Sequence, residues 1–208
     1  MHPVLGIDFD NTLICYDDIF YQVAVERRLI PSDTARSKTA VKNYLLAVDR
    51  EYLWTELQGE VYGPNISKAR PFDGAFETIK YLMNAGVKCR LISHKTRSPY
   101  SGTPYDLHTA AMNWLEENRF FLESGLNWKK EQVFFEVTKE SKISRICSEG
   151  CTHFLDDLTE ILMLLPDGVR KLKFILRQRG SWPSLQSSLK PVATVVCLEF
   201  EPVKLMPS

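Results

Sequence analysis

The sequence predicts an α/β fold, a doubly wound parallel β-sheet covered by helices on both faces. Apolar runs of strand length alternate with amphipathic segments of helix length along most of the 208 residues. One region departs from this alternation, because residues from about Asp17 to Arg70 have helical patterns and contribute no strand. The sequence therefore also predicts a small helical domain inserted after the first strand.

The first part of the chain contains the first strand and the insertion. Val4 to Phe9 is a short apolar run that ends in acidic residues, which predicts a buried strand. Tyr16 to Ile30 has helical spacing and ends at Pro31. Ser32 to Gln58 contains no Gly or Pro and predicts one long helix or two shorter ones.

The second part alternates helices and strands. Helices are expected from an Asp73 cap to Ala85, from an Asp106 cap through Leu115, at Lys139–Cys147 and at Leu158–Leu165. Strands are expected at Val87–Ile92, Val133–Val137, Thr152–Leu155, Leu172–Leu176 and Thr194–Leu198. The predicted domains are a core of residues 1–16 and 71–208 and a helical insertion of residues 17–70.

Composition restricts the possible partners and location. Lys plus Arg equals Asp plus Glu at 26 each, so we expect no nucleic-acid partner and no anionic membrane surface. No apolar run reaches the roughly 18 residues of a membrane span, and no signal peptide is recognisable, so a cytoplasmic location is expected. The five cysteines match no zinc spacing and are expected to be reduced.

Acidic side chains follow two of the predicted strands. Asp8 and Asp10 come at the end of the first strand, and Asp156 and Asp157 follow the strand Thr152–Leu155. Because the carboxyl ends of parallel strands meet at one edge of a sheet, these four carboxylates are expected to converge. Close carboxylates repel one another, and hard oxygen ligands favour magnesium. The sequence therefore predicts a Mg²⁺ site.

A hydroxyl and a lysine are expected at the same edge. Ser93 ends the strand VKCRLIS and is placed to donate a hydrogen bond to a phosphoryl oxygen. Lys142 precedes the strand that ends at Asp156 and is suited to neutralise phosphate charge, with Lys139 as the competing candidate. His94 and Lys95 follow Ser93, and contact with substrate and a solvated loop are equally good interpretations for them.

Taken in order, these residues resemble the four motifs of the haloacid dehalogenase superfamily. Residues 8–12, Asp-Phe-Asp-Asn-Thr, match its DxDx(T/V) motif. Ser93 matches the second motif, Lys142 the third, and the acidic pair of FLDD, residues 154–157, the fourth. The resemblance implies a Rossmann-like core, and the helical insertion lies where that superfamily places its first type of cap.

The resemblance also implies roles for these residues. Asp8 attacks phosphorus and forms an aspartyl-phosphate, and Asp10 protonates the leaving group and then activates water. Magnesium is held by Asp8, the Asp10 backbone carbonyl and Asp156, with Asp157 assisting. Ser93 and Lys142 bind the phosphoryl group, and Asn11 and Thr12 of the first motif are expected to contribute. The presence of Asp10 favours phosphate chemistry over dehalogenation, because a halide leaving group needs no proton.

The sequence therefore predicts a magnesium-dependent phosphatase that acts on a small phosphorylated metabolite. A phosphomutase or a phosphonate hydrolase on the same site is an alternative, and phosphonate cleavage would require a cap lysine such as Lys38 or Lys42. A binding module that keeps the fold without catalysis is another. The substrate and the oligomeric state are not encoded in any pattern that we recognise.

Overall fold

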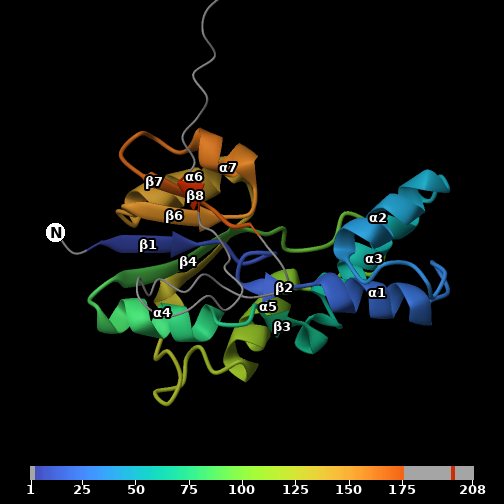
Figure 1. Ribbon diagram of the computed structural model, residues 1–208, viewed down its shortest axis with the longest axis horizontal. Coiled ribbons are helices and arrows are strands. Elements are labelled where there is room, and N and C mark those ends of the chain that lie inside the picture. The colour runs from blue at the N-terminus through green and yellow to red at the C-terminus, as the bar shows by residue number, and fades with distance from the viewer. Residues whose placement is uncertain (1–2, 176–197, 200–208) are drawn as a thin grey trace, which may run out of the picture. The chain divides into compact units, whose positions relative to one another are not determined.

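The computed structural model describes residues 3–175 and 198–199, and the chain forms two compact units (Figure 1). The first unit comprises Met1–Leu13, Phe72–His94 and Glu131–Ser208. The second comprises Ile14–Pro71 and Lys95–Lys130.

The first unit is built on a single sheet with the strand order β5-β4-β1-β6-β7-β8. Its strands are β1 (Val4–Ile7), β4 (Lys88–His94), β5 (Val133–Glu136), β6 (His153–Asp156), β7 (Arg170–Lys173) and β8 (Leu198–Glu199). The first five pair in parallel, and β8 pairs antiparallel with β7 at the edge. Counted along the chain, the parallel strands have the order 3-2-1-4-5, so the predicted doubly wound sheet is confirmed.

Helices cover both faces of this sheet. Figure 1 shows α4 (Ala75–Asn84) on one face and α6 (Lys139–Ser148) and α7 (Thr159–Leu164) on the other. The face under α6 and α7 holds an apolar cluster of buried residues from the strands and helices: Ile92, Ile146, Cys151, Phe154, Ile161, Leu162, Leu165 and Val169. A short 3-10 helix, η2 (Lys130–Gln132), precedes β5.

The central position of β1 determines where a ligand can bind in this unit. Gly6 of β1 pairs with Arg90 of β4 on one side and with Phe154 of β6 on the other. A Cβ at Gly6 would lie 2.4 Å from the Phe154 ring, so glycine leaves the room that this ring occupies beside β1. The chain extends the sheet in opposite directions from β1, and the carboxyl ends of β1, β4 and β6 therefore form a topological switch point, where α/β proteins bind ligands.

The second unit is mainly helical. It contains β2 (Ile14–Cys15), α1 (Asp17–Glu26), α2 (Lys38–Ala47), α3 (Glu51–Tyr62), the 3-10 helix η1 (Ile66–Lys68), β3 (Arg70–Pro71) and α5 (Leu107–Glu117). The antiparallel pair β2–β3 joins the ends of residues 14–71. Aromatic rings pack between α1 and α3, where Phe20 stacks on Trp54 with ring centroids 4.9 Å apart.

The predicted elements differ from the structure in a few places. Of the two alternatives for Ser32–Gln58, the structure has two helices, because Asp49 has a left-handed φ of 56° between α2 and α3, but α3 continues past Gln58 to Tyr62. Gly74, with φ 83°, is the N-cap of α4 in place of the predicted Asp73. The strand expected at Leu172–Leu176 runs instead from Arg170 to Lys173. Most of the strand predicted at Thr194–Leu198 lies outside the described residues.

The division into units also differs from the predicted domains. The structure groups residues 95–130 with the helical unit, whereas the sequence analysis assigned them to the core. The reason is the packing of α5, because the indole Nε1 of Trp114 donates a 2.9 Å hydrogen bond to the carbonyl oxygen of Ala69 and Trp114 is fully buried. The action of the helical unit as a cap stays a prediction.

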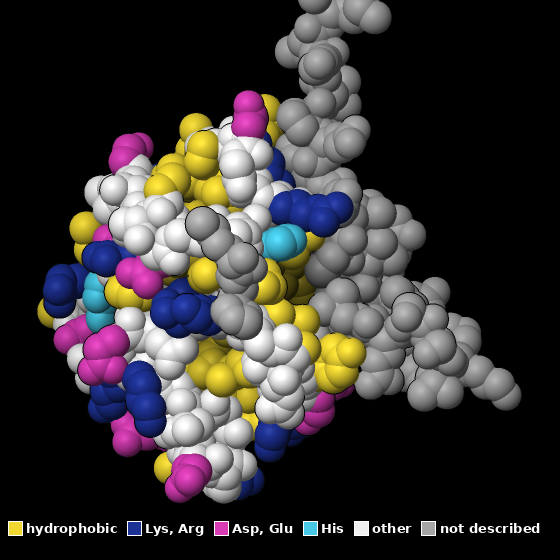
Figure 2. All heavy atoms as spheres, turned by 90° about the vertical axis from the view of Figure 1, so that its left-hand side faces the viewer, with side chains coloured by type: hydrophobic (Ala, Val, Ile, Leu, Met, Phe, Trp, Pro, Cys, Tyr) yellow, Lys and Arg dark blue, Asp and Glu magenta, His cyan; other side chains and the backbone are white. Residues whose placement is uncertain are grey.

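The charge distribution on the surface and the length of the helices bear on the partners expected from the composition. Figure 2 shows one face of the molecule, on which Lys and Arg side chains intermingle with Asp and Glu side chains. Within the described residues, none of the helices has the length and apolar character that a membrane crossing requires.

Candidate active site

Asp8 follows the central strand β1 directly and belongs to the first unit. Its backbone nitrogen donates a 2.9 Å hydrogen bond to the carbonyl oxygen of Leu155 in β6, which continues the sheet pairing by one residue. The side chain is buried, with 5% of the residue exposed. The Oγ of Ser93 in β4 donates a 2.9 Å hydrogen bond to Asp8 Oδ1. Asp8 and Ser93 therefore meet at the carboxyl ends of adjacent strands, as the sequence predicted.

Lys142 lies near the start of α6 and reaches the same carboxylate. Its Nζ donates to Asp8 Oδ1 and to Asp156 Oδ2, both at 2.6 Å, and the residue is 1% exposed. The helix start is fixed by a capping box between Thr138 and Ser141, so the backbone that carries Lys142 is well defined. The competing candidate, Lys139, forms an ion pair with Glu160 at 3.0 Å instead. Of the two candidates, Lys142 is therefore the one that contacts Asp8 and Asp156.

The acidic pair at the end of β6 has two distinct environments. Asp156 is fully buried and its Oδ1 accepts a 2.7 Å hydrogen bond from the backbone nitrogen of Leu158. Asp157 is half-buried, and its Oδ1 lies 3.5 Å from the Thr12 hydroxyl that donates to it. The last residue of β6, Asp156, and the first residue after it, Asp157, therefore bring both carboxylates to the edge where β1 ends.

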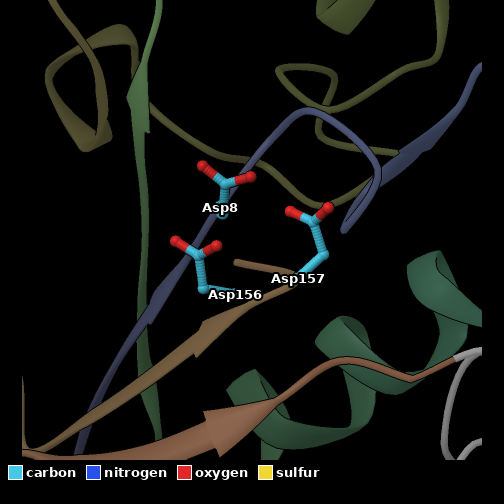
Figure 3. A group of neighbouring side chains, drawn as sticks. All are labelled: Asp8, Asp156 and Asp157. Atoms are coloured by element: carbon cyan, nitrogen blue, oxygen red, sulfur yellow. The ribbon is translucent and has the colours of Figure 1, made fainter. Parts of the chain in front are cut away.

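Three carboxylates meet at this edge. Asp8, Asp156 and Asp157 each offer a carboxylate oxygen, and these atoms lie within 4.8 Å of one another (Figure 3). Four carboxylates were expected to converge from the sequence, and Asp10 is not in this group. Asp10 was expected to bind the metal through its backbone carbonyl, which stays a prediction.

Burial makes the charges of this cluster unfavourable without a further cation. Burial raises the pKa of Asp8 to about 7, and Lys142 opposes that shift while the carboxylates of Asp156 and Asp10 reinforce it. Burial also raises the pKa of Asp156. Burial lowers the pKa of Lys142, but its two carboxylate partners outweigh this effect and the net pKa is raised. Lys142 is therefore cationic at neutral pH and neutralises only one of its two partners.

The donor set fits a divalent cation. Carboxylate oxygens are hard ligands of the kind that Mg²⁺ binds, usually with waters and substrate phosphate completing its coordination. The excess negative charge beside the Lys142 ammonium gives such a cation a favourable electrostatic environment. Asp8, Asp156 and Asp157 are the residues that would hold it.

The remaining residues that the sequence singled out lie in the turn after β1 and at or just after the end of β4. Asn11 adopts a left-handed φ of 58° where the chain turns after Asp10. Thr12 is fully buried and its hydroxyl contacts Asp157, and phosphate binding by Asn11 and Thr12 stays a prediction. His94 donates from Nε2 to the carbonyl oxygen of Val137 at 3.3 Å. Lys95 belongs to the second unit, where its Nζ lies 4.8 Å from the Tyr62 ring centroid.

Sequence reasoning missed Lys173. This residue ends β7, pairs in register with Asp156, and donates from Nζ to the carbonyl oxygen of Asp157. The acidic pair is followed along the chain by a further strand, and a lysine at the end of that strand is only a weak sequence signal of a functional residue. It gains meaning only once β6 and β7 are known to be neighbours.

Comparisons with known proteins give structural neighbours only. None of the protein-family models matches the chain, and neither does any curated protein. A structure described as a haloacid dehalogenase-like hydrolase from Bacteroides fragilis has 16% identity and a TM-score of 0.49, covering 82% of this chain and 86% of that one. A dehalogenase structure has 13% identity and a TM-score of 0.49, covering 86% and 88%.

A third neighbour is phosphoserine phosphatase in its apo form. It has 16% identity and a TM-score of 0.45, covering 82% of this chain and 85% of that chain. Similarity at this level carries no argument about activity. The chain is thus similar in fold to these solved structures.

Proposed function

We propose that this chain is a haloacid dehalogenase-superfamily phosphatase that depends on magnesium and hydrolyses a small-molecule phosphate ester. One observation carries the proposal: the buried Asp8 carboxylate accepts hydrogen bonds from Ser93 and Lys142 and lies beside the carboxylates of Asp156 and Asp157. A nucleophile, two phosphate-binding donors and a cation site then share one strand edge. The proposed location is the cytoplasm, with a phosphorylated metabolite as the partner and with neither nucleic acid nor membrane.

Asp8 acts as the nucleophile. Ser93 and Lys142 both donate to its Oδ1, and Oδ2 is therefore the oxygen that attacks phosphorus. Attack forms an Asp8 acyl phosphate and breaks the bond between phosphorus and the ester oxygen. Asp8, Asp156 and Asp157 would hold a magnesium ion, which would supply positive charge that offsets the carboxylate and phosphoryl charges.

Asp10 acts as the acid and then as the base. It follows Asp8 by two residues, and it is half-exposed while Asp8 is buried. It donates its proton to the departing ester oxygen and then takes a proton from the water that hydrolyses the acyl phosphate. The site therefore returns to its starting protonation after each cycle. A halide leaving group would need no such acid, and Asp10 thus supports phosphate chemistry.

Ser93 and Lys142 stabilise the charge that develops on the phosphoryl oxygens. Both donors are buried and already oriented by their contacts with Asp8, so little reorganisation is needed when the substrate binds. Phosphoryl transfer depends mainly on such positioning and charge stabilisation.

The proposal is tested with a panel of phosphate esters, by measuring phosphate release with and without Mg²⁺. We expect release that requires Mg²⁺ and that is abolished by Asp8→Asn. Asp167→Asn makes the same chemical change at an exposed residue and is expected to leave the rate unchanged. Equal rates for the unmodified protein and Asp8→Asn on every ester would disprove catalysis by Asp8. Mg²⁺-dependent trapping of beryllofluoride without any turnover would favour the non-catalytic binding module.

A further inference from the structure

We propose that Lys173 is a positioning residue for the cation site. Together with Thr12 it holds the backbone of Asp157, so that the Asp157 carboxylate is presented beside Asp8 and Asp156. This inference rests on the proposed function, because it concerns the cation that the phosphatase would use.

Asp157 lies just beyond the end of the sheet pairing. The last register pair between β6 and β7 joins Asp156 to Lys173, so Asp157 is the first residue after the strand. Its carboxylate is nevertheless one of the three that meet within 4.8 Å. A ligand that follows a strand end needs other contacts to define its position.

Side chains from two separate segments provide these contacts. The backbone nitrogen of Asp157 donates to Thr12 Oγ1 at 3.1 Å, and the carbonyl oxygen of Asp157 accepts from Lys173 Nζ. The Thr12 hydroxyl also donates to Asp157 Oδ1, at 3.5 Å. Thr12 is fully buried in the turn after β1, and Lys173 is half-buried on β7. Both main-chain polar groups of Asp157 are thus held from opposite sides of β6.

The charge of Lys173 allows a test that separates positioning from electrostatics. An ammonium group near a divalent cation repels it, so removal of the Lys173 charge would by itself tighten cation binding. Loss of the hydrogen bond to Asp157 would instead release a ligand and weaken binding, as the loss of outer contacts to metal ligands commonly does. The two effects have opposite signs.

The experiment measures Mn²⁺ binding to the full chain by the electron paramagnetic resonance signal of free Mn²⁺. We expect Lys173→Met to raise the dissociation constant about 10-fold. Lys171→Met is the matched control, because Lys171 is half-buried on the same strand and pairs with Phe154 rather than with an acidic residue. It removes the same charge and is expected to leave the dissociation constant unchanged.

Conservative variants complete the test. Lys173→Arg keeps a donor and is expected to bind Mn²⁺ more tightly than Lys173→Met. Thr12→Val removes the hydroxyl at nearly constant shape and is expected to weaken binding, while Thr12→Ser restores it. Circular dichroism checks that each variant is folded. If Lys173→Met does not fold, the comparison of Thr12→Val with Thr12→Ser tests the positioning role instead.

The outcomes distinguish the inference from the proposed function. If Lys173→Met is folded and binds Mn²⁺ as tightly as the unmodified protein or more tightly, the positioning role is overturned and the cation site still stands. If Lys173→Met is unfolded, equal Mn²⁺ binding by Thr12→Val and Thr12→Ser has the same consequence. An unmodified protein that binds no Mn²⁺ would overturn both the inference and the magnesium-dependent function.

Discussion

The two units of the chain bury different kinds of side chain. In the first unit, Asp8, Ser93, Lys142 and Asp156 are buried together where β1, β4 and β6 end. In the second unit, aromatic rings pack against one another, with Phe20 stacked on Trp54 and in edge contact with Tyr16. Buried ions rarely stabilise a fold more than apolar groups of similar size, whereas aromatic packing does stabilise it. This difference agrees with the proposed functional role of the first cluster and with a stabilising role of the second.

The largest effect is expected from Lys142→Met in the ionic cluster. Removing one partner of a buried ion pair leaves uncompensated charge on Asp8 and Asp156, which costs about 3–5 kcal/mol of unfolding free energy. Phosphate release should fall by about 100-fold or more, because a donor to the phosphoryl group is lost.

Lys139→Met is the matched control for that prediction. Lys139 is on the same helix and forms an exposed pair with Glu160, so its loss should cost under about 1 kcal/mol. Urea unfolding and a phosphate-release assay measure both variants. Equal effects of the two substitutions would contradict the role given to Lys142.

Phe20→Ala is expected to have the largest effect on the aromatic cluster. Phe20 is fully buried, and its truncation should cost about 3–5 kcal/mol through lost transfer energy and an unfilled cavity. Tyr52→Ala is the control within the same unit, because Tyr52 is 62% exposed and should change stability little. Thermal unfolding of both variants tests this difference. A small loss for Phe20→Ala would show that the ring cluster does not hold the helical unit together.

A smaller effect is expected at the start of α6. Thr138 accepts a 3.0 Å hydrogen bond from the Ser141 nitrogen and begins the helix that carries Lys142. Thr138→Ala should cost about 1 kcal/mol, and Thr138→Ser should recover most of it. Urea unfolding measures both. If the alanine variant were as stable as the unmodified protein, the capping box would be unimportant for the placement of Lys142.

The smallest effect concerns the cysteines. Burial raises the pKa of the Cys89 and Cys151 thiols to about 12, while Cys147 is exposed. Iodoacetamide at pH 8 should therefore modify Cys147 before the other two, as mass spectrometry of peptides can show. The folded protein keeps these two thiols protonated to a higher pH than the unfolded chain does. The free energy of unfolding should therefore fall as pH rises from about 9 to about 12. Fast modification of Cys89 in the folded protein would contradict this prediction.

Much of the candidate site could be predicted because it depends on strand ends. An apolar run followed by acidic residues is visible in sequence, and parallel pairing brings such ends to one edge. Asp8, Ser93 and Asp156 were located in this way. Helix patterns left open whether Ser32–Gln58 holds one helix or two, because Asp49 turns the chain without a Gly or Pro. They also did not predict that residues 95–130 join the helical unit, because that grouping depends on the burial of Trp114.

The sequence by itself determined the doubly wound sheet and the order of the acidic, hydroxyl and basic residues along it, because hydrophobic periodicity and local residue chemistry are properties of short segments. The tertiary structure decided which lysine reaches Asp8, why the Thr12 hydroxyl serves Asp157, and that Lys173 holds the Asp157 carbonyl. These contacts join residues that are 16 to 145 positions apart. Their partners are selected by strand register and helix placement, which no local pattern encodes.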